Sequence, residues 1–199
     1  MTPDDVLSFW FGELGELGLA SKAQAERWFR KDPTFDAEIR QRFAGLHSEI
    51  MAGTHEAWQD TAEGRLAYVI VLDQFSRNMF RDTPRMFASD ERAVGATLQG
   101  LERGHDRVLP THPRMFMYMP LMHSEALAMQ DKCVATFTTL RDELLPGEAR
   151  AFMDFAIGYA NAHRDIIHRF ARFPHRNSVL GRVSTPEELE FLTQPGSSF

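Results

Sequence analysis

Hydrophobic residues recur every three or four positions along most of this chain, and the strict alternation that is typical of strands is nearly absent. One such stripe runs from Phe35 to Ile50, with Pro33 before it and Gly53 after it, as at ordinary helix boundaries. The segment from Thr61 to Phe80 is apolar nearly all round in its middle, which is expected of a central helix surrounded by others. The pattern therefore predicts an all-α fold without a sheet.

Cap residues, prolines and glycines divide the rest of the chain into further helices. The expected segments are Pro3–Gly12, Ser21–Arg30, Pro33–Gly53, Thr61–Phe80, Ser89–Arg103, Pro120–Asp142 and Glu148–Ala171. A short last helix is expected after Ser184, with Pro186 in its first turn and Glu187 completing a capping box.

Length and composition place the chain among ordinary soluble globular proteins. Its 199 residues are 43% hydrophobic and 25% charged, and no linker or low-complexity tract divides them, so residues 1–199 are predicted to form a single helical domain. The most apolar run, Leu66 to Leu72, is far shorter than the roughly 20 residues of a membrane-spanning helix. The acidic N-terminal segment lacks an export signal, and the lone Cys133 cannot form an internal disulfide. We therefore expect no membrane association and a cytoplasmic location, and no pattern specifies an oligomeric state.

Two charged residues interrupt the apolar stripe of the central segment. Asp73 and Arg77 are four positions apart, the spacing at which opposite charges meet on a helix. One interpretation is a structural, half-buried ion pair that ties this helix to a neighbour. The other is that Asp73 and Arg77, with Arg81, line a polar cleft. Both interpretations remain open at this stage.

Histidines give a second set of candidates. His123 and Glu125 would point about 200° apart on a helix that begins at Pro120, so they are not expected to share a site. His163 interrupts an apolar seam that includes Tyr159, and we expect it to be a buried, hydrogen-bonded structural residue. No H-E-x-x-H spacing occurs and there is one cysteine, so no metal and no cofactor are predicted.

The segment from His163 to Arg182 contains five arginines and one aspartate, in a chain whose net charge is -6. Because guanidinium groups bind carboxylates and phosphates through paired hydrogen bonds, this segment is a candidate anion site. Pro174 predicts a turn that could bring Arg176 and Arg182 towards Arg77 and His123. The expected pocket is lined by Arg77, His123, Arg176 and Asn177. The alternative is that Arg176 only binds carbonyl groups at the end of a helix.

Three stretches carry a resemblance to a known family: DQFSRNMFRDTPRMFASD, FMYMPLMHSEALAMQ and RFARFPHRNSVLGRVSTPEELEFL. With the early FWFG they resemble the bacterial domain-of-unknown-function 924 family over nearly the whole chain. The resemblance implies a TPR-like, right-handed stack of antiparallel helix pairs, and it implies no reaction. Ser76 stands where the family often has proline, and Ala171 where it often has glycine. Alanine there predicts that the helix runs on towards Phe173.

Two functions remain open. The first is a protein that binds a small anion or an acidic peptide end through arginines, namely Arg77, Arg81, Arg169, Arg172, Arg176 and Arg182, with His123 and Asn177 beside them. The second is a hydrolase-like enzyme that holds an anionic substrate with arginines and uses a general base. Its base would be His123, His163 or His168, beside Asp73, Glu125 or Asp165. Cys133 lies on an apolar seam and is a poor nucleophile. No P-loop or dinucleotide-binding motif occurs, and an acidic chain is a poor ligand for nucleic acid.

Overall fold

The computed structural model describes residues 1–198, which form helices and no strand beyond a single isolated bridge between Leu14 and Ala20. The α-helices are α1 (Pro3–Phe11), α2 (Lys22–Phe29), α3 (Pro33–Met51), α4 (Ala62–Ile70), α5 (Ser76–Met79), α6 (Asp90–Glu102), α7 (Thr111–His123), α8 (Leu127–Glu143), α9 (Glu148–Phe170) and α10 (Pro186–Phe191). Short 3-10 turns are η1 (Glu56–Asp60), η3 (Pro84–Phe87), η4 (His105–Val108) and η5 (Pro174–Arg176), and η2 (Val71–Phe75) is a π-helical turn. The all-α prediction is confirmed.

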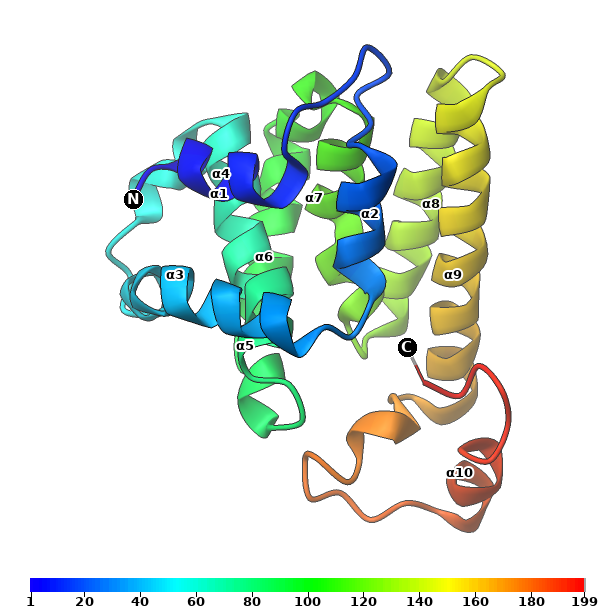
Figure 1. Ribbon diagram of the computed structural model, residues 1–199. Helices are drawn as coiled ribbons and strands as arrows, with labels where there is room; N and C mark the ends of the chain where they lie inside the picture. Colours follow the sequence, from blue (N-terminus) through cyan, green and yellow to red (C-terminus); the bar gives the residue numbers. More distant parts are fainter. Residues whose placement is uncertain (199) are drawn as a thin grey trace.

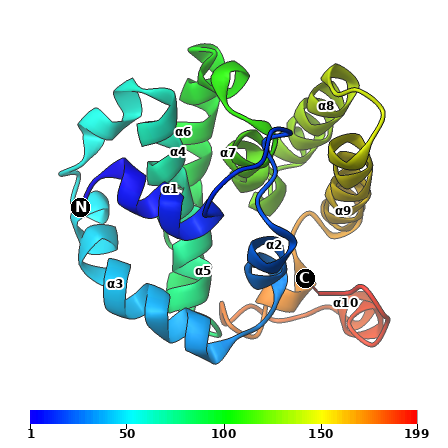
Figure 2. The same ribbon diagram turned by 45° about the horizontal axis from the view of Figure 1, so that its top comes forward.

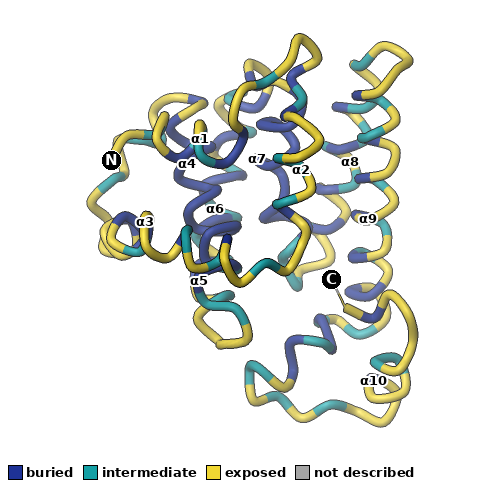
Figure 3. Tube along the Cα trace, in the orientation of Figure 1, coloured by how far each residue is buried: buried dark blue, intermediate teal, exposed yellow. Residues whose placement is uncertain are grey.

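The two most deeply buried helices, α4 and α7, lie at the centre of the molecule (Figures 1 and 3). Helices α1 and α6 pack against α4, while α6, α8 and α9 pack against α7. Figure 2 shows α8 and α9 as an antiparallel pair at one side of this centre. A TPR-like stacking of the helix pairs stays a prediction. None of the helices within residues 1–198 combines the length and the hydrophobicity that crossing a bilayer requires.

The start of several helices follows from local hydrogen bonding. Thr2 and Asp5 form a capping box at α1, in which Thr2 N donates to the Asp5 carboxylate over 2.7 Å. The second capping box lies one residue later than predicted. Thr185, and not Ser184, caps α10, and its partner is Glu188. Because Pro186 forces the residue before it into an extended conformation, Thr185 already has the backbone geometry of an N-cap.

The predicted helix start at Pro120 is wrong. Pro120 lies inside α7, and α8 begins only at Leu127. A proline inside a helix removes one backbone hydrogen bond. Residues 111–122 of α7 are buried on every side by neighbouring helices, so packing holds the helix together through that position. His123 is therefore the last residue of α7, and Glu125 lies beyond its end.

The predicted continuation of the last long helix past Ala171 is also wrong. Helix α9 ends at Phe170, and Ala171 has a φ of 56°, in the left-handed region where glycine is favoured. The amide of Ala171 donates to the carbonyl of Ile167. The chain thus makes its turn at the place where the resembled family often has glycine, although this residue is an alanine.

This alanine gives a direct test of the helix end. Ala171→Gly is expected to raise the free energy of unfolding by about 1 kcal/mol, because a Cβ is unfavourable at left-handed φ. The matched control is Ala162→Gly, at an exposed position within α9, which should lower it by about 1 kcal/mol. Chemical denaturation of both variants measures the two changes, and equal destabilisation by both would show that Ala171 is not strained.

Candidate functional site

Asp73 lies in a widened turn of the central helix. The π-helical turn η2 separates α4 from α5, and such turns occur often at functional sites. Polar side chains bind the carbonyl groups of this turn. Ser89 Oγ donates to the Leu72 carbonyl over 2.6 Å, and Arg77 Nη1 donates to the Asp73 carbonyl over 3.0 Å. The turn is thereby fixed, with Asp73 buried in the interior.

The carboxylate of Asp73 is 1% exposed and contacts three polar side chains. Its Oδ1 lies 3.0 Å from Arg77 Nη1 and 2.7 Å from His123 Nδ1. Gln74 Nε2 donates to Oδ2 over 2.6 Å. Burial alone would raise the pKa of Asp73, but the charge of Arg77 and the contacts with His123 outweigh it and lower the pKa to about 2. Asp73 is therefore ionised at neutral pH.

His123 approaches Asp73 from the end of α7, and its side chain is 12% exposed. Burial and the charge of Arg77 hold the pKa of His123 below its ordinary value, although Asp73 acts in the opposite direction. A neutral imidazole beside an ionised carboxylate carries its proton on Nδ1, which donates to Asp73. Its Nε2 then has a free electron pair, and it makes no hydrogen bond within residues 1–198. This arrangement is that of a histidine oriented for general-base chemistry.

Asp90, the first residue of α6, joins two arginines to this pair. Arg77 donates to both of its carboxylate oxygens, over 3.0 and 3.1 Å, and Arg176 Nη1 lies 3.4 Å from Oδ2. Asp73, Arg77, Asp90, His123 and Arg176 are called the α7-end cluster from here on. With His123 neutral, its two carboxylates balance its two guanidinium groups, so the cluster carries no net charge.

Arg176 belongs to η5, where the chain turns back beneath α7 (Figure 1). Its Nη2 donates to the carbonyl of His123 over 2.9 Å, which is the helix-end contact considered as the alternative. Its guanidinium also lies over the rings of Phe87 and Phe173, at 4.5 and 4.4 Å from their centroids. Arg176 thus binds a helix end, and it also shares Asp90 with Arg77. Burial, followed by the charge of Arg77, lowers its pKa to about 10.

Arg182 and Asn177 lie next to this cluster and hold the C-terminal segment in place. Arg182 binds Glu125 through two hydrogen bonds of 2.7 and 2.9 Å, and its Nε donates to Asn177 Oδ1 over 2.9 Å. The backbone amide of Phe173 donates to the same Glu125 over 2.8 Å. Glu125 therefore connects the α7–α8 link to the C-terminal segment.

His163 is buried in α9, where its Nδ1 hydrogen-bonds the carbonyl of Tyr159 over 2.8 Å. Its ring centroid lies 6.4 Å from that of His123, so it borders the α7-end cluster. Tyr159 itself is 48% exposed, which contradicts its place in the predicted seam. The buried stripe of α9 is rotated so that Ala160, instead of Tyr159, packs inward. His168 and Asp165 are exposed and contact no member of the cluster.

The remaining candidates lie outside the cluster. Arg81 donates to Asp36 of α3 over 2.7 and 2.9 Å, and this contact does not bring it to His123. Arg169 and Arg172 bind acidic residues of α10. Burial raises the pKa of the Cys133 thiol, which agrees with its place in the apolar core. Among residues 1–198, no three potential metal ligands gather into a site.

Two residues of the site were not recognised as such in the sequence. Asp90 stands at the start of a helix, where acidic residues are common, and Phe87 ends the short 3-10 turn η3. A single sequence gives no signal that either one faces Arg176, since 86 positions separate Asp90 from that residue.

Comparisons with known proteins agree on the fold and give no reaction. The sequence matches the family model DUF924, described as a bacterial protein of unknown function, over residues 6–196. A solved structure of a protein of unknown function from Agrobacterium tumefaciens is 35% identical in sequence, with a TM-score of 0.80 and 96% of each chain covered. Among curated proteins, none matches this sequence significantly.

Proposed function

We propose, from the premise that this chain belongs to the bacterial DUF924 family, that the α7-end cluster binds a small anionic molecule and that His123 acts on it as a general base. The single observation that carries this proposal is the 2.7 Å contact between Asp73 and His123 Nδ1, with Nε2 unpaired among the described residues. The contact supports a hydrolase-like reaction in which Nε2 accepts a proton from an attacking water and later returns it to the leaving group.

Each neighbour would have a distinct role in this reaction. The ionised Asp73 fixes the tautomer of His123 and stabilises the imidazolium that forms when Nε2 takes a proton. Arg77 contacts both Asp73 and Asp90, and its charge keeps Asp73 ionised in the interior. Arg176 would bind the anionic group of the substrate. The contact of Arg176 with Asp90 is long, at 3.4 Å. If a substrate takes the place of Asp90 on Arg176, Asp90 keeps its two shorter contacts with Arg77.

Binding of an anion without a reaction is the second candidate, and Arg176 favours it. Its side chain is 7% exposed, and the buried Nε has no hydrogen-bond partner among residues 1–198. A buried guanidinium whose hydrogen bonds are incomplete is a suitable partner for a carboxylate or a phosphate. Arg182 and Asn177 would then contribute by holding this segment against α7.

A histidine substitution tests the catalytic proposal. His123→Gln is expected to lower the hydrolysis of a reporter such as p-nitrophenyl phosphate by about 10²- to 10⁴-fold, the usual contribution of a general base. The matched control is His168→Gln, an exposed position outside the cluster, which should leave the rate unchanged. Phosphate binding, followed through the ¹⁵N resonances of His123 in the wild type, separates the two candidates.

A shift of the His123 Nε2 resonance when phosphate is added, without any hydrolysis of the reporter, would favour binding alone. Nε2 that carries the proton in the free protein at neutral pH would contradict the general-base proposal. If phosphate leaves this resonance unchanged, both candidates at this site are wrong.

A further inference from the structure

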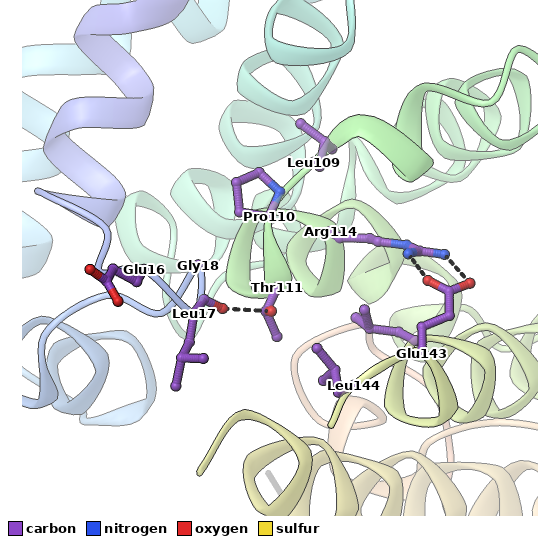
Figure 4. A pocket seen from close by; sticks show the side chains of 10 residues that line it. Glu16, Leu17, Gly18, Leu109, Pro110, Thr111, Arg114, Glu143 and Leu144 are labelled. Carbon is purple, nitrogen blue, oxygen red and sulfur yellow. Dashed lines mark hydrogen bonds and ion pairs between the residues drawn. The ribbon is translucent and has the colours of Figure 1, made fainter. Parts of the chain in front are cut away.

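A second polar site lies at the opposite end of α7, around a cavity of about 270 Å³ (Figure 4). Its walls come from the loop between α1 and α2, the start of α7 and the end of α8. Leucines and a proline form part of the lining, and the polar part includes Glu16, Arg114, Glu143 and the start of α7 at Thr111. The volume is just below the roughly 300–1,000 Å³ of ordinary small-molecule sites, so its occupant would be small.

The loop that forms one wall is held firmly against α7. Thr111 Oγ1 donates to the Leu17 carbonyl over 2.8 Å, as drawn in Figure 4, and His112 N donates to the Gly18 carbonyl over 3.0 Å. The amide of Ala20 donates to His112 Nδ1 over 2.9 Å. At Gly18, with φ of 69°, an added Cβ would lie only 2.6 Å from Pro110 Cβ. The wall is therefore preformed, and a ligand would not have to order it.

Arg114 provides the charge of this cavity. The residue is 7% exposed, and its Nε donates to the hydroxyl of Tyr118 over 2.7 Å. Its two terminal nitrogens bind the carboxylate of Glu143, as the dashed lines of Figure 4 show. The two partners differ greatly in exposure, because the side chain of Glu143 is 52% exposed and that of Arg114 only 9%. The guanidinium is fixed within the protein, while its carboxylate partner reaches it from the solvent.

We infer that this cavity binds a short monocarboxylate with an apolar chain, whose carboxylate takes the place of Glu143 on Arg114. The exchange replaces one paired carboxylate by another, so Arg114 never loses its counter-ion. Glu143 can return to water at little cost, since half of it is already hydrated.

The apolar wall determines the rest of the ligand. Leu17, Leu109 and Leu144 surround the space beside the guanidinium, and Leu17 is 56% exposed before binding. A hydrocarbon chain would cover these surfaces and gain the free energy of burying apolar area. An inorganic anion would bind Arg114 without this contribution. Asp106, 3.8 Å from Arg114 Nε, remains as a second negative charge and disfavours dianions.

Titration calorimetry with hexanoate tests the inference, with hexanol and hexylamine as neutral and cationic probes of the same length. Hexanoate is expected to bind at least about tenfold more tightly than either probe, since only it can pair with Arg114. Glu143→Gln removes the competing carboxylate and should strengthen hexanoate binding about three- to tenfold.

A matched pair of variants locates the site. Leu17→Glu places a charge on the cavity wall and should weaken hexanoate binding about tenfold or more. Leu145→Glu makes the same change at a residue that is 86% exposed and does not line the cavity, and it should leave binding unchanged. Both positions are exposed, so the variants are expected to fold. Equal affinity for hexanoate and hexanol, equal effects of the two variants, or no hexanoate binding at 20-fold excess over about 1 mM protein would each overturn the inference.

Discussion

Replacing Arg77 by alanine is expected to lower the free energy of unfolding by about 3–5 kcal/mol, the usual cost of removing one partner from a buried ion pair. Arg77 contacts Asp73 at 3.0 Å and binds both oxygens of Asp90, so its loss leaves two carboxylates without their main counter-ion. Arg176 cannot compensate, because it lies 3.4 Å from Asp90 and has no direct contact with Asp73 among its described interactions. Urea denaturation of the variant measures the change.

The matched control is Arg164→Ala, which removes a surface arginine from its pair with Asp131. Both side chains of that pair are exposed by 40% or more, so the expected loss is at most about 1 kcal/mol. A similar, small loss for both variants would show that the α7-end cluster does not stabilise the fold. Asp73 and Arg77 would then contribute to the proposed site and not to the stability of the fold.

Acidification from about pH 6 to about pH 4 is expected to lower the free energy of unfolding by about 7 kcal/mol. Burial lowers the pKa values of His112 and His175 to about 4 and that of His163 to about 3. The unfolded chain binds these three protons below about pH 6.5, whereas the folded chain keeps the three rings largely neutral, so stability falls as the pH falls. Each histidine contributes about 1.4 kcal/mol per pH unit in this range. The lowered pKa of Asp73 adds a further loss only below about pH 4, as the pH approaches about 2.

Denaturation curves at several pH values measure this slope. His163→Gln should remove about a third of it, because one of the three titrating histidines is lost, whatever the variant does to stability at neutral pH. His168→Gln, at an exposed position of the same helix, should leave the slope unchanged. An equal slope in the wild type and in His163→Gln would mean that burial does not keep His163 neutral.

Local pattern was sufficient for the class of the fold and for most helix boundaries. Helix-period stripes, caps and glycines are short-range features, and they depend on backbone sterics and on hydrogen bonds within one turn. The contact of Asp73 with Arg77 also follows from spacing along one helix. The misplaced start at Pro120 and the unexpected turn at Ala171 have a different origin. At Pro120 the surrounding packing holds a helical geometry that proline disfavours. At Ala171 the chain turns with a φ of 56°, which alanine itself disfavours.

The sequence by itself determined that this protein is helical, that Asp73 and Arg77 meet, and that the chain turns near Pro174. Only the tertiary structure decided that His123 faces Asp73 across 50 positions, that Asp90 joins Arg77 to Arg176, and that Arg114 lies beside a cavity at the other end of α7. The physical reason is the separation in sequence between the residues that interact. Spacing along a helix defines which side chains share a face, but the partner across the interface depends on how the helices pack and where α7 ends.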